Sequence, residues 1–138
     1  MLSEESSEED IQQRHQWPVL WLVDPLDGTK EFIKKNDEFT VNIALIQNQQ
    51  PILGVIGVPA KNLVYSAVRG EGAFKQLGDN ELQNIQVKRQ NPDHLIFAVS
   101  RSHLDDQTKA MMDEYQAKML QAGSALKLAF VAEGIVDV

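Results

Sequence analysis

Residues 21–30 read WLVDPLDGTK, and this stretch carries the strongest structural signal in the chain. The apolar run 19–23 is short and stops at Asp24, which favours a buried strand over a helix. Asp24 and Asp27 leave the end of that strand three residues apart, with a proline between them, and Gly28 permits a tight reversal. We therefore expect both carboxylates to be aimed at one point.

The residue types in this turn suit a metal ion beside a phosphate group. Hard cations such as Mg²⁺ prefer carboxylate and carbonyl oxygens, and the Leu26 carbonyl lies between the two acids as a third oxygen. The amides of Gly28, Thr29 and Lys30 fall at the start of an expected helix over 29–35, where unpaired N–H groups bind phosphate. Metal and phosphate would then be adjacent.

Each acid also has a purely structural interpretation. Asp is common at strand-end turns, which would suffice for Asp24, and at helix N-caps, which would suffice for Asp27. The two acids together, with proline, glycine and threonine at fixed offsets after an apolar strand, favour the functional interpretation.

The rest of the chain predicts a layered fold. β-rich segments alternate with turn residues after the first strand, which indicates an antiparallel meander. Its expected strands are 39–46, 52–58, 63–68 and 73–76, with an edge strand near 85–87. The later elements expected are a strand at 95–99, a helix from Ser102 or Asp105 to about Leu120, a helix from 123 to 132 closed by Gly134, and the start of a strand at 135–138.

Composition narrows the function. The chain has 138 residues, with 13 Lys and Arg against 20 Asp and Glu and a formal net charge of −7. This acidic balance argues against binding a nucleic-acid polymer, which relies on clustered basic residues. The sequence has no cysteine, which excludes disulfides and thiolate chemistry. It shows no secretory signal and no apolar run of membrane-spanning length, so we expect a cytoplasmic protein, with a peripheral place at the inner membrane left open.

The stretch DPLDGTKEF resembles the signature of the inositol monophosphatase superfamily of magnesium-dependent phosphatases. The segments FTVNIALI, PILGVIGVP, SRSH and GSALKLAFVAEG are similar to its CysQ-type 3′(2′),5′-bisphosphate nucleotidase branch. The resemblance implies an α/β (α+β) layered sandwich with a mixed, largely antiparallel sheet and packed helices. It also implies that metal-activated water removes the 3′-phosphate of adenosine 3′,5′-bisphosphate, with two or three Mg²⁺ ions in the intact domain.

The resemblance assigns roles to individual residues. The implied metal ligands are Glu4, Asp24, the Leu26 carbonyl and Asp27. Glu5 would support a ligand or the turn through hydrogen bonds. Thr29 and Glu4 would orient the attacking water, so the implied catalytic residues are Glu4, Asp24 and Thr29. The pair at positions 8 and 9 is a competing Glu-Glu element.

The implied substrate-binding residues are Gly28, Thr29, Lys30, His103, Ser124 and Lys127. Ser124 and Lys127 lie one helical turn apart, so their polar tips can share a face that meets the nucleotide's sugar or second phosphate. A capping Ser and a Lys lying along the surface are the structural alternative. His103 would lie near the nucleotide or would simply start a helix, and Arg101 would serve phosphate or solvent.

Two parts of the family pattern are missing from the sequence. The family has an acidic ligand in a helical region upstream and another in a Trp-Asp pair beyond residue 135. We therefore expect a single partial phosphatase domain over 1–138. Its expected parts are an acidic loop at 1–16, a strand, signature and meander at 17–76, and a strand with two helices at 77–138.

Other functions remain open at this point. Inositol monophosphate and sugar bisphosphates are alternative substrates within the superfamily. Aspartyl-phosphate phosphatases also show Asp-Gly-Thr after a strand, but their two acids are two residues apart, whereas Asp24 and Asp27 are three apart. The non-enzyme alternative is a core that binds a cation or self-associates, as a homodimer, through an open sheet edge.

Overall fold

The computed structural model describes residues 1–88, 94–101 and 104–138. Its strands are β1 Leu2–Ser3, β2 Val19–Asp27, β3 Thr40–Gln47, β4 Gln50–Val58, β5 Leu63–Val68, β6 Gly72–Leu77, β7 Gln83–Ile85, β8 Ile96–Val99 and β9 Lys118–Gln121. Its α-helices are α1 Glu8–Gln13, α2 Thr29–Lys34, α3 Asp106–Glu114 and α4 Leu126–Ala132, with 3₁₀ turns at Arg14–Gln16 and Pro59–Lys61.

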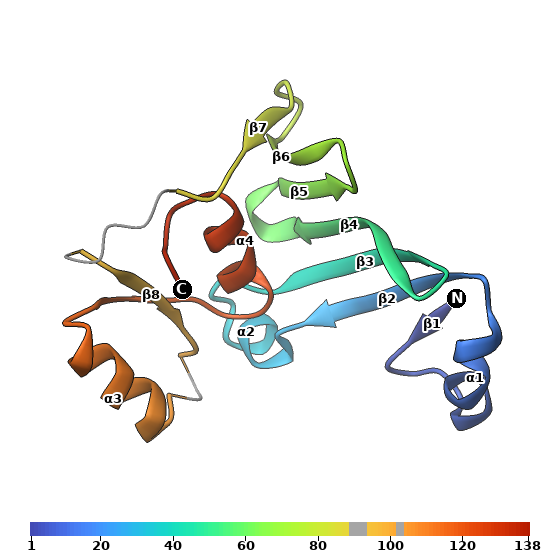
Figure 1. The fold of residues 1–138 in the computed structure, drawn as a ribbon, viewed down its shortest axis with the longest axis horizontal. Helices are drawn as coiled ribbons and strands as arrows, with labels where there is room; N and C mark the ends of the chain where they lie inside the picture. Colours follow the sequence, from blue (N-terminus) through green and yellow to red (C-terminus); the bar gives the residue numbers. More distant parts are fainter. Residues whose placement is uncertain (89–93, 102–103) are drawn as a thin grey trace.

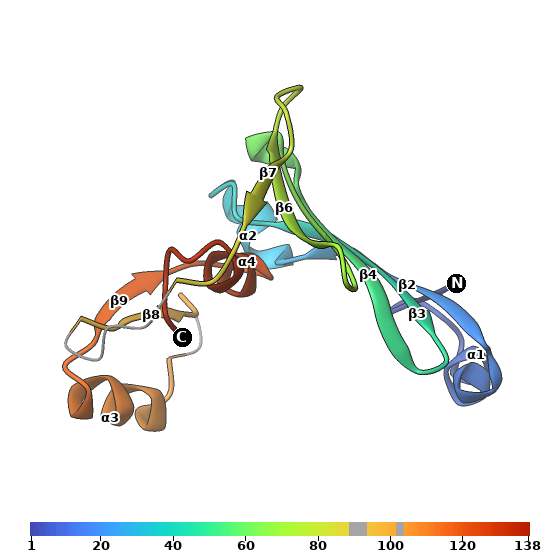
Figure 2. The same cartoon turned by 45° about the horizontal axis from the view of Figure 1, so that its top comes forward.

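The strands form two sheets joined through α4. The larger sheet has seven strands in the order β1 to β7, and the smaller one pairs β8 with β9. Strand β1 runs parallel to β2, and all the pairs from β2 to β7 are antiparallel. Helix α4 lies between the two sheets, and α3 lies beyond the smaller one (Figures 1 and 2). The mixed, largely antiparallel sheet with packed helices is confirmed.

The meander follows from local turn chemistry. Strands β3 and β4 are joined by Asn48 and Gln49, whose φ angles are 48° and 62°. Two-residue hairpin loops favour such positive φ values, because their twist matches that of the flanking strands. The expected strands at 63–68 and 73–76 are likewise confirmed as β5 and β6. The predicted edge strand near 85–87 is displaced, because β7 pairs with β6 through Gln83–Ile85.

The prediction of an acidic loop over 1–16 is wrong. Residues Glu8–Gln13 form α1, and the Ser7 side chain accepts a hydrogen bond from the Asp10 N–H at 3.2 Å. Three acidic residues fill the first turn of this helix, where they interact favourably with its dipole. The acidity that suggested a solvated loop is therefore part of a helix start.

The prediction of one helix reaching Leu120 is also wrong. Asp105 is the N-cap of α3, as expected, and accepts from the Thr108 N–H at 2.7 Å, while Ser102 lies outside the described residues. The helix ends at Glu114, and Gln116 has a φ of 48°, a left-handed conformation that stops helix propagation. The chain then forms β9, parallel to β8, because tertiary pairing outweighs local helix propensity. Residues 77–138 thus hold β9 in addition to the expected elements.

Helix α4 confirms the second expected helix in a shortened form. It starts at Leu126, and Gly134 follows its end with a φ of 75°. Residues 135–138 do not form a regular strand, but they lie along β8. The Asp137 N–H donates to the Ile96 carbonyl at 2.8 Å, and the Ala98 N–H donates to the Val138 carbonyl at 2.7 Å.

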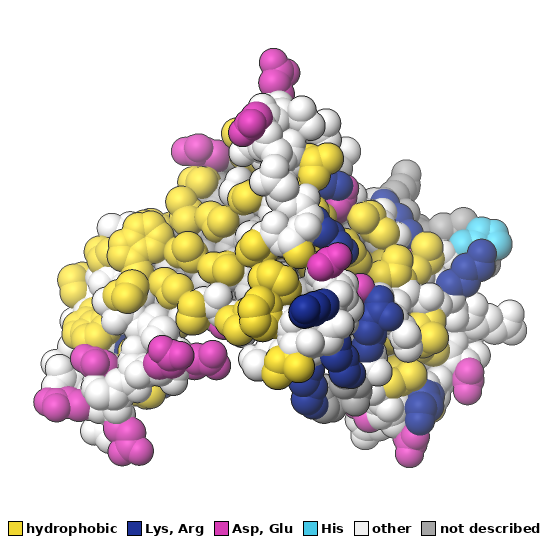
Figure 3. Space-filling view, turned by 180° about the vertical axis from the view of Figure 1, so that it is seen from behind, with side chains coloured by type: hydrophobic (Ala, Val, Ile, Leu, Met, Phe, Trp, Pro, Cys, Tyr) yellow, Lys and Arg dark blue, Asp and Glu magenta, His cyan; other side chains and the backbone are white. Residues whose placement is uncertain are grey.

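The core lies between α4 and the middle of the large sheet. Its buried members are Val58, Tyr65, Ala122, Leu126 and Ala129. Strand β2 contributes none of these residues, and its Val19, Trp21 and Leu22 are 50, 44 and 43% exposed. The prediction that 19–23 is a buried strand is therefore wrong, because α4 packs over β4 and β5. Hydrophobic side chains are visible over much of the rear face of the molecule (Figure 3).

No helix in the described part of the chain is long and apolar enough to cross a membrane.

Candidate metal and phosphate site

A β-bulge in β2 places both signature aspartates on one face of the sheet. Asp24 is opposite Asn42 of β3, and Asp27 is opposite Thr40 of the same strand. Three steps along β2 therefore correspond to two along β3, so β2 holds one extra residue. Residues three apart on a regular strand point to opposite faces, but this extra residue returns Asp27 to the face of Asp24.

Two side chains of β3 hold the Asp27 carboxylate. The Thr40 hydroxyl and the Asn42 side-chain amide both donate to Asp27 Oδ2, each at 3.3 Å. Thr40 is fully buried, so its hydroxyl has a fixed position. The N-cap of α2 is Gly28 and not Asp27, so the interpretation of Asp27 as a helix N-cap is wrong.

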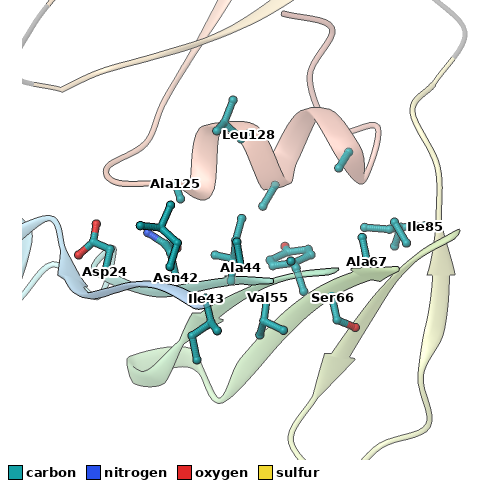
Figure 4. Close-up of a pocket in the computed structure, with 17 residues that line it drawn as sticks. Asp24, Asn42, Ile43, Ala44, Val55, Ser66, Ala67, Ile85, Ala125 and Leu128 are labelled. Carbon is teal, nitrogen blue, oxygen red and sulfur yellow. The ribbon is translucent and has the colours of Figure 1, made fainter. Parts of the chain in front are cut away.

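The Asp24 carboxylate is held by a hydrogen bond within its own turn. Its Oδ1 accepts a hydrogen bond from the Leu26 N–H at 3.2 Å, which closes an Asx turn over Pro25. In Figure 4, Asp24 and Asn42 lie side by side at one end of a cavity beneath α4. This cavity measures about 570 Å³, and most of its lining is apolar.

The predicted ligand Glu4 is brought to the same end of the sheet. Leu2 pairs with Leu22 and Ser3 with Val23. Glu4 therefore comes directly after β1, and Asp24 comes directly after the part of β2 that pairs with β1. A turn begins there, in which the Ser6 N–H donates to the Ser3 carbonyl at 3.1 Å. Glu4 and Glu5 are both exposed. Across 1–88, 94–101 and 104–138, no three acidic or histidine side chains are grouped to hold a metal ion, so Glu4 is not part of a preformed cluster.

The signature turn packs against a segment almost 100 residues later in the sequence. The Ser124 hydroxyl donates to the Asp27 carbonyl at 2.8 Å. Gly28 has a φ of 89°, and a Cβ added to it would lie 2.0 Å from the Ser124 hydroxyl oxygen. A Cβ added to Gly123 would lie 2.6 Å from the Glu31 side chain. Both glycines are therefore required for this close approach.

Most of the predicted substrate-binding residues line a second hollow of about 500 Å³. Its lining includes Gly28 and Lys30 from the signature turn and Ser124 and Lys127 from the later segment, together with the acidic residues Asp27 and Glu31. Thr29 is the exposed first residue of α2 and is not among the lining residues. His103 lies outside the described residues. Asp24 and Asp27 thus share a face of the sheet but border different hollows.

The predicted helical spacing of Ser124 and Lys127 is wrong in detail. Ser124 precedes α4 and has a φ of 52°, so it is not on the helix. The two residues are nevertheless close, because the Lys127 ammonium group donates to the Ser124 carbonyl at 2.8 Å. The predicted proximity arises from a loop and not from a helix face.

Arg101 contacts a carboxylate that the sequence did not single out. Its guanidinium donates to both oxygens of Glu38, from Nε at 2.8 Å and from Nη2 at 2.6 Å. The hydrogen bond from Arg101 lowers the pKa of Glu38 below its ordinary value, against the opposing effect of burial. This pair excludes the view that Arg101 only faces solvent.

The donor set at the signature turn fits Mg²⁺. The two aspartates and the Leu26 carbonyl supply only oxygen, which hard divalent cations prefer. The Asn42 Oδ1 atom is buried without a hydrogen-bond partner. A buried acceptor without a donor is rare, and here it lies beside Asp24 and Asp27, where a metal-bound water would supply one.

Sequence reasoning missed three residues that shape this site. Thr40 and Asn42 had a usable signal, because they are polar at alternate positions of an otherwise apolar strand and so share one face. Glu38 had no such signal, since its partners lie 63 and 85 residues away.

The whole chain is similar to proteins of one known family. A model of the inositol monophosphatase family matches residues 1–138. The 3′(2′),5′-bisphosphate nucleotidase CysQ of Escherichia coli K12 is 46% identical over 132 residues, covering 93% of this chain and 52% of that protein. The corresponding protein of Haemophilus influenzae is 34% identical, covering 99% of this chain and 52% of that protein.

A solved structure gives the same result. The crystal structure of CysQ from Bacteroides thetaiotaomicron, a bacterial member of the inositol monophosphatase family, superposes with a TM-score of 0.83 at 41% identity, covering 98% of this chain and 56% of that one. The chain therefore spans about half the length of the curated relatives it matches.

Proposed function

Because this chain belongs to the inositol monophosphatase family, we propose that it supplies the metal and phosphate corner of a Mg²⁺-dependent phosphomonoesterase. The observation that carries this proposal is the second hollow. There, Asp27, Gly28 and Lys30 of the signature turn meet Ser124 and Lys127 of a segment distant in sequence. Two acidic residues, Asp27 and Glu31, and two lysines, Lys30 and Lys127, thus line one space.

The proposed substrate is adenosine 3′,5′-bisphosphate, from which the 3′-phosphate is removed. The CysQ relatives are named as 3′(2′),5′-bisphosphate nucleotidases, which supports this choice. The charge pattern supports it too, because Lys30 and Lys127 approach the hollow from separate segments and suit a molecule with phosphates at two positions. Inositol monophosphate has a single phosphate and would use only one of them.

The chain's own residues prepare the reaction in distinct ways. Asp24, Asp27 and the Leu26 carbonyl would hold the metal, with Asp27 kept in place by the hydrogen bonds to its Oδ2. Thr29 and Glu4 would orient the attacking water. When bound, Mg²⁺ lowers the pKa of coordinated water and stabilises charge on the departing oxygen.

The alternative of a phosphorylated-aspartate mechanism makes a different prediction. It would require Asp24 to attack phosphorus with an acid-base Asp two residues away, whereas Asp27 is three residues away. Water attack leaves no covalent phosphoenzyme. Trapping a phosphorylated Asp24 would contradict the proposal.

The test measures binding and turnover on one sample. Isothermal titration with Mg²⁺, followed by adenosine 3′,5′-bisphosphate, reports binding, and phosphate release with the same nucleotide reports turnover. Inositol monophosphate is the competing substrate. We expect Mg²⁺-dependent binding with preference for the nucleotide, and equal or reversed preference would contradict the proposed substrate.

A result of binding without phosphate release has its own meaning. It would support the non-catalytic, cation-binding alternative for these 138 residues, while the proposed ligand would stand. Sedimentation of the same sample would report self-association through an open sheet edge. The two edge strands of the large sheet, β1 and β7, are only 2 and 3 residues long, so we expect weak association through that sheet.

A further inference from the structure

Glu38 is a buried carboxylate at the junction of the two sheets. It lies between α2 and β3, and only 9% of its surface is exposed. Charged side chains are rarely buried unless they are paired and hydrogen-bonded. Its partners therefore indicate what the burial achieves.

Three N–H groups from two separate segments converge on this carboxylate. Arg101, just after β8, donates to both oxygens, and the Gly123 backbone N–H, just after β9, donates to Oε2 at 2.9 Å. Arg101 Nη2 also approaches the Gln121 carbonyl at 3.4 Å. Glu38 thus joins the ends of both strands of the small sheet to the large sheet.

The residue after Gly123 has an unfavourable backbone conformation. Ser124 has a φ of 52°, which is uncommon for a residue with a side chain and requires support from its surroundings. One support is its hydrogen bond to the Asp27 carbonyl. The other is the fixed N–H of Gly123, which Glu38 accepts from the preceding position.

We propose that Glu38 is a positioning residue of the nucleotide site, which holds Gly123 and thereby keeps Ser124 on the signature turn. We call the contacts of Glu38 with Arg101 and Gly123 the clamp. The identity of the ligand rests on the proposed function, but the clamp itself does not. Arg101 is part of the clamp, since its Nε and Nη2 are directed at Glu38. Phosphate recognition in the second hollow then depends on Lys30 and Lys127.

The test compares Glu38→Gln with a matched control in the same chain. Glu38→Gln keeps the size of the side chain and removes its charge. The control is Glu133→Gln, because the Glu133 carboxylate also bridges two groups, the Tyr65 hydroxyl at 2.7 Å and the Lys75 ammonium. That cluster lies at the other end of α4, away from Ser124. Titrations with adenosine 3′,5′-bisphosphate are run where circular dichroism shows every variant folded.

Glu38→Gln should weaken nucleotide binding about tenfold, and Glu133→Gln should change it by less than about twofold. Equal weakening in the two variants would overturn the proposal, since general loss of stability would then explain both. Should Glu38→Gln fail to fold, Arg101→Lys replaces it. That variant keeps the positive charge, loses the two-pronged contact, and should weaken binding in the same direction.

Hydrogen exchange of backbone amides tests the clamp without a ligand. The Gly123 and Ser124 amides should exchange about tenfold faster in Glu38→Gln than in the unaltered chain, and at an unchanged rate in Glu133→Gln. Unchanged exchange in Glu38→Gln overturns the clamp. If the unaltered chain binds no nucleotide, the proposed substrate fails, and the exchange result alone supports or overturns the role of Glu38.

Discussion

The signature turn at 24–30 and the acidic start at 1–16 both carry candidate ligands, but they are held very differently. Asp27 is fixed through hydrogen bonds from Thr40 and Asn42, and its own carbonyl accepts from Ser124. Glu4 is exposed and follows a strand of only two residues. One region is organised by distant segments of the chain, and the other is attached by a short parallel pair.

This contrast bears on how a metal would bind. A ligand that is already positioned loses little conformational freedom when the metal arrives, whereas an exposed side chain has to be ordered at that moment. The signature turn should therefore provide most of the Mg²⁺ affinity, and Glu4 should add a smaller part.

The largest effect is expected from Asp27→Asn. This change removes a ligand charge, and it should weaken Mg²⁺ binding by more than about 100-fold, because outer-shell partners alone are worth ~10–100-fold. Isothermal titration measures the affinity. Asp24→Asn should also weaken Mg²⁺ binding. Where the unaltered chain releases phosphate, Asp24→Asn should abolish that release. Unchanged Mg²⁺ affinity in both variants would remove the signature turn from the metal site.

The next effect concerns the groups that hold Asp27. Thr40→Val keeps the shape of the fully buried side chain but removes the hydroxyl that donates to Asp27 Oδ2. We expect Mg²⁺ affinity to fall about tenfold, and Thr40→Ser, which keeps a hydroxyl, to retain most of it. If the two variants bind Mg²⁺ equally, the hydroxyl does not position Asp27.

Glu4→Gln should have a smaller effect than either change. Its exposed carboxylate adds charge near the turn without being held there, so the loss of Mg²⁺ affinity should stay below about tenfold. The matched control is Glu8→Gln, because Glu8 belongs to the competing pair at positions 8 and 9 and lies in the first turn of α1. A loss as large as that of Asp27→Asn would show that the acidic start is as organised as the signature turn.

The smallest effect is a pH dependence of stability. The pKa of Glu38 is lowered in the folded chain, chiefly by the Arg101 hydrogen bond, so its stabilising contribution is present above its ordinary pKa of 4.5. That contribution is lost as pH falls through the lowered folded-state value. Urea unfolding at a series of pH values below neutrality should show a shallower acid loss in Glu38→Gln, by less than about 1 kcal/mol. An identical acid profile in Glu38→Gln would contradict the ion pair.

Sequence reasoning succeeded where the signal was local. The strand before Asp24, the helix at 29–35, the meander and the Asp105 cap all follow from short-range patterns, and the structure contains each of them. The structure places Lys30 and Ser124 on one hollow, while their substrate-binding role, which the family resemblance implies, stays a prediction.

The errors came from contacts between distant segments. The end of the helix predicted to reach Leu120 is strand β9 in the structure, because the pairing of β9 with β8 leaves no trace in local periodicity. The bulge that aligns Asp24 with Asp27 is visible only in the register with β3. Glu38 was missed for the same reason, since a lone Glu before a strand shows nothing of Arg101 or Gly123.

Paramagnetic broadening by Mn²⁺, used in place of Mg²⁺, tests the central claim most directly. If the oxygens of the signature turn hold the cation, amide signals from residues 24–30, with those of Thr40 and Ser124, should disappear first as Mn²⁺ is added. Broadening centred on the acidic residues 4–10, with the signals of 24–30 unaffected, would contradict the account.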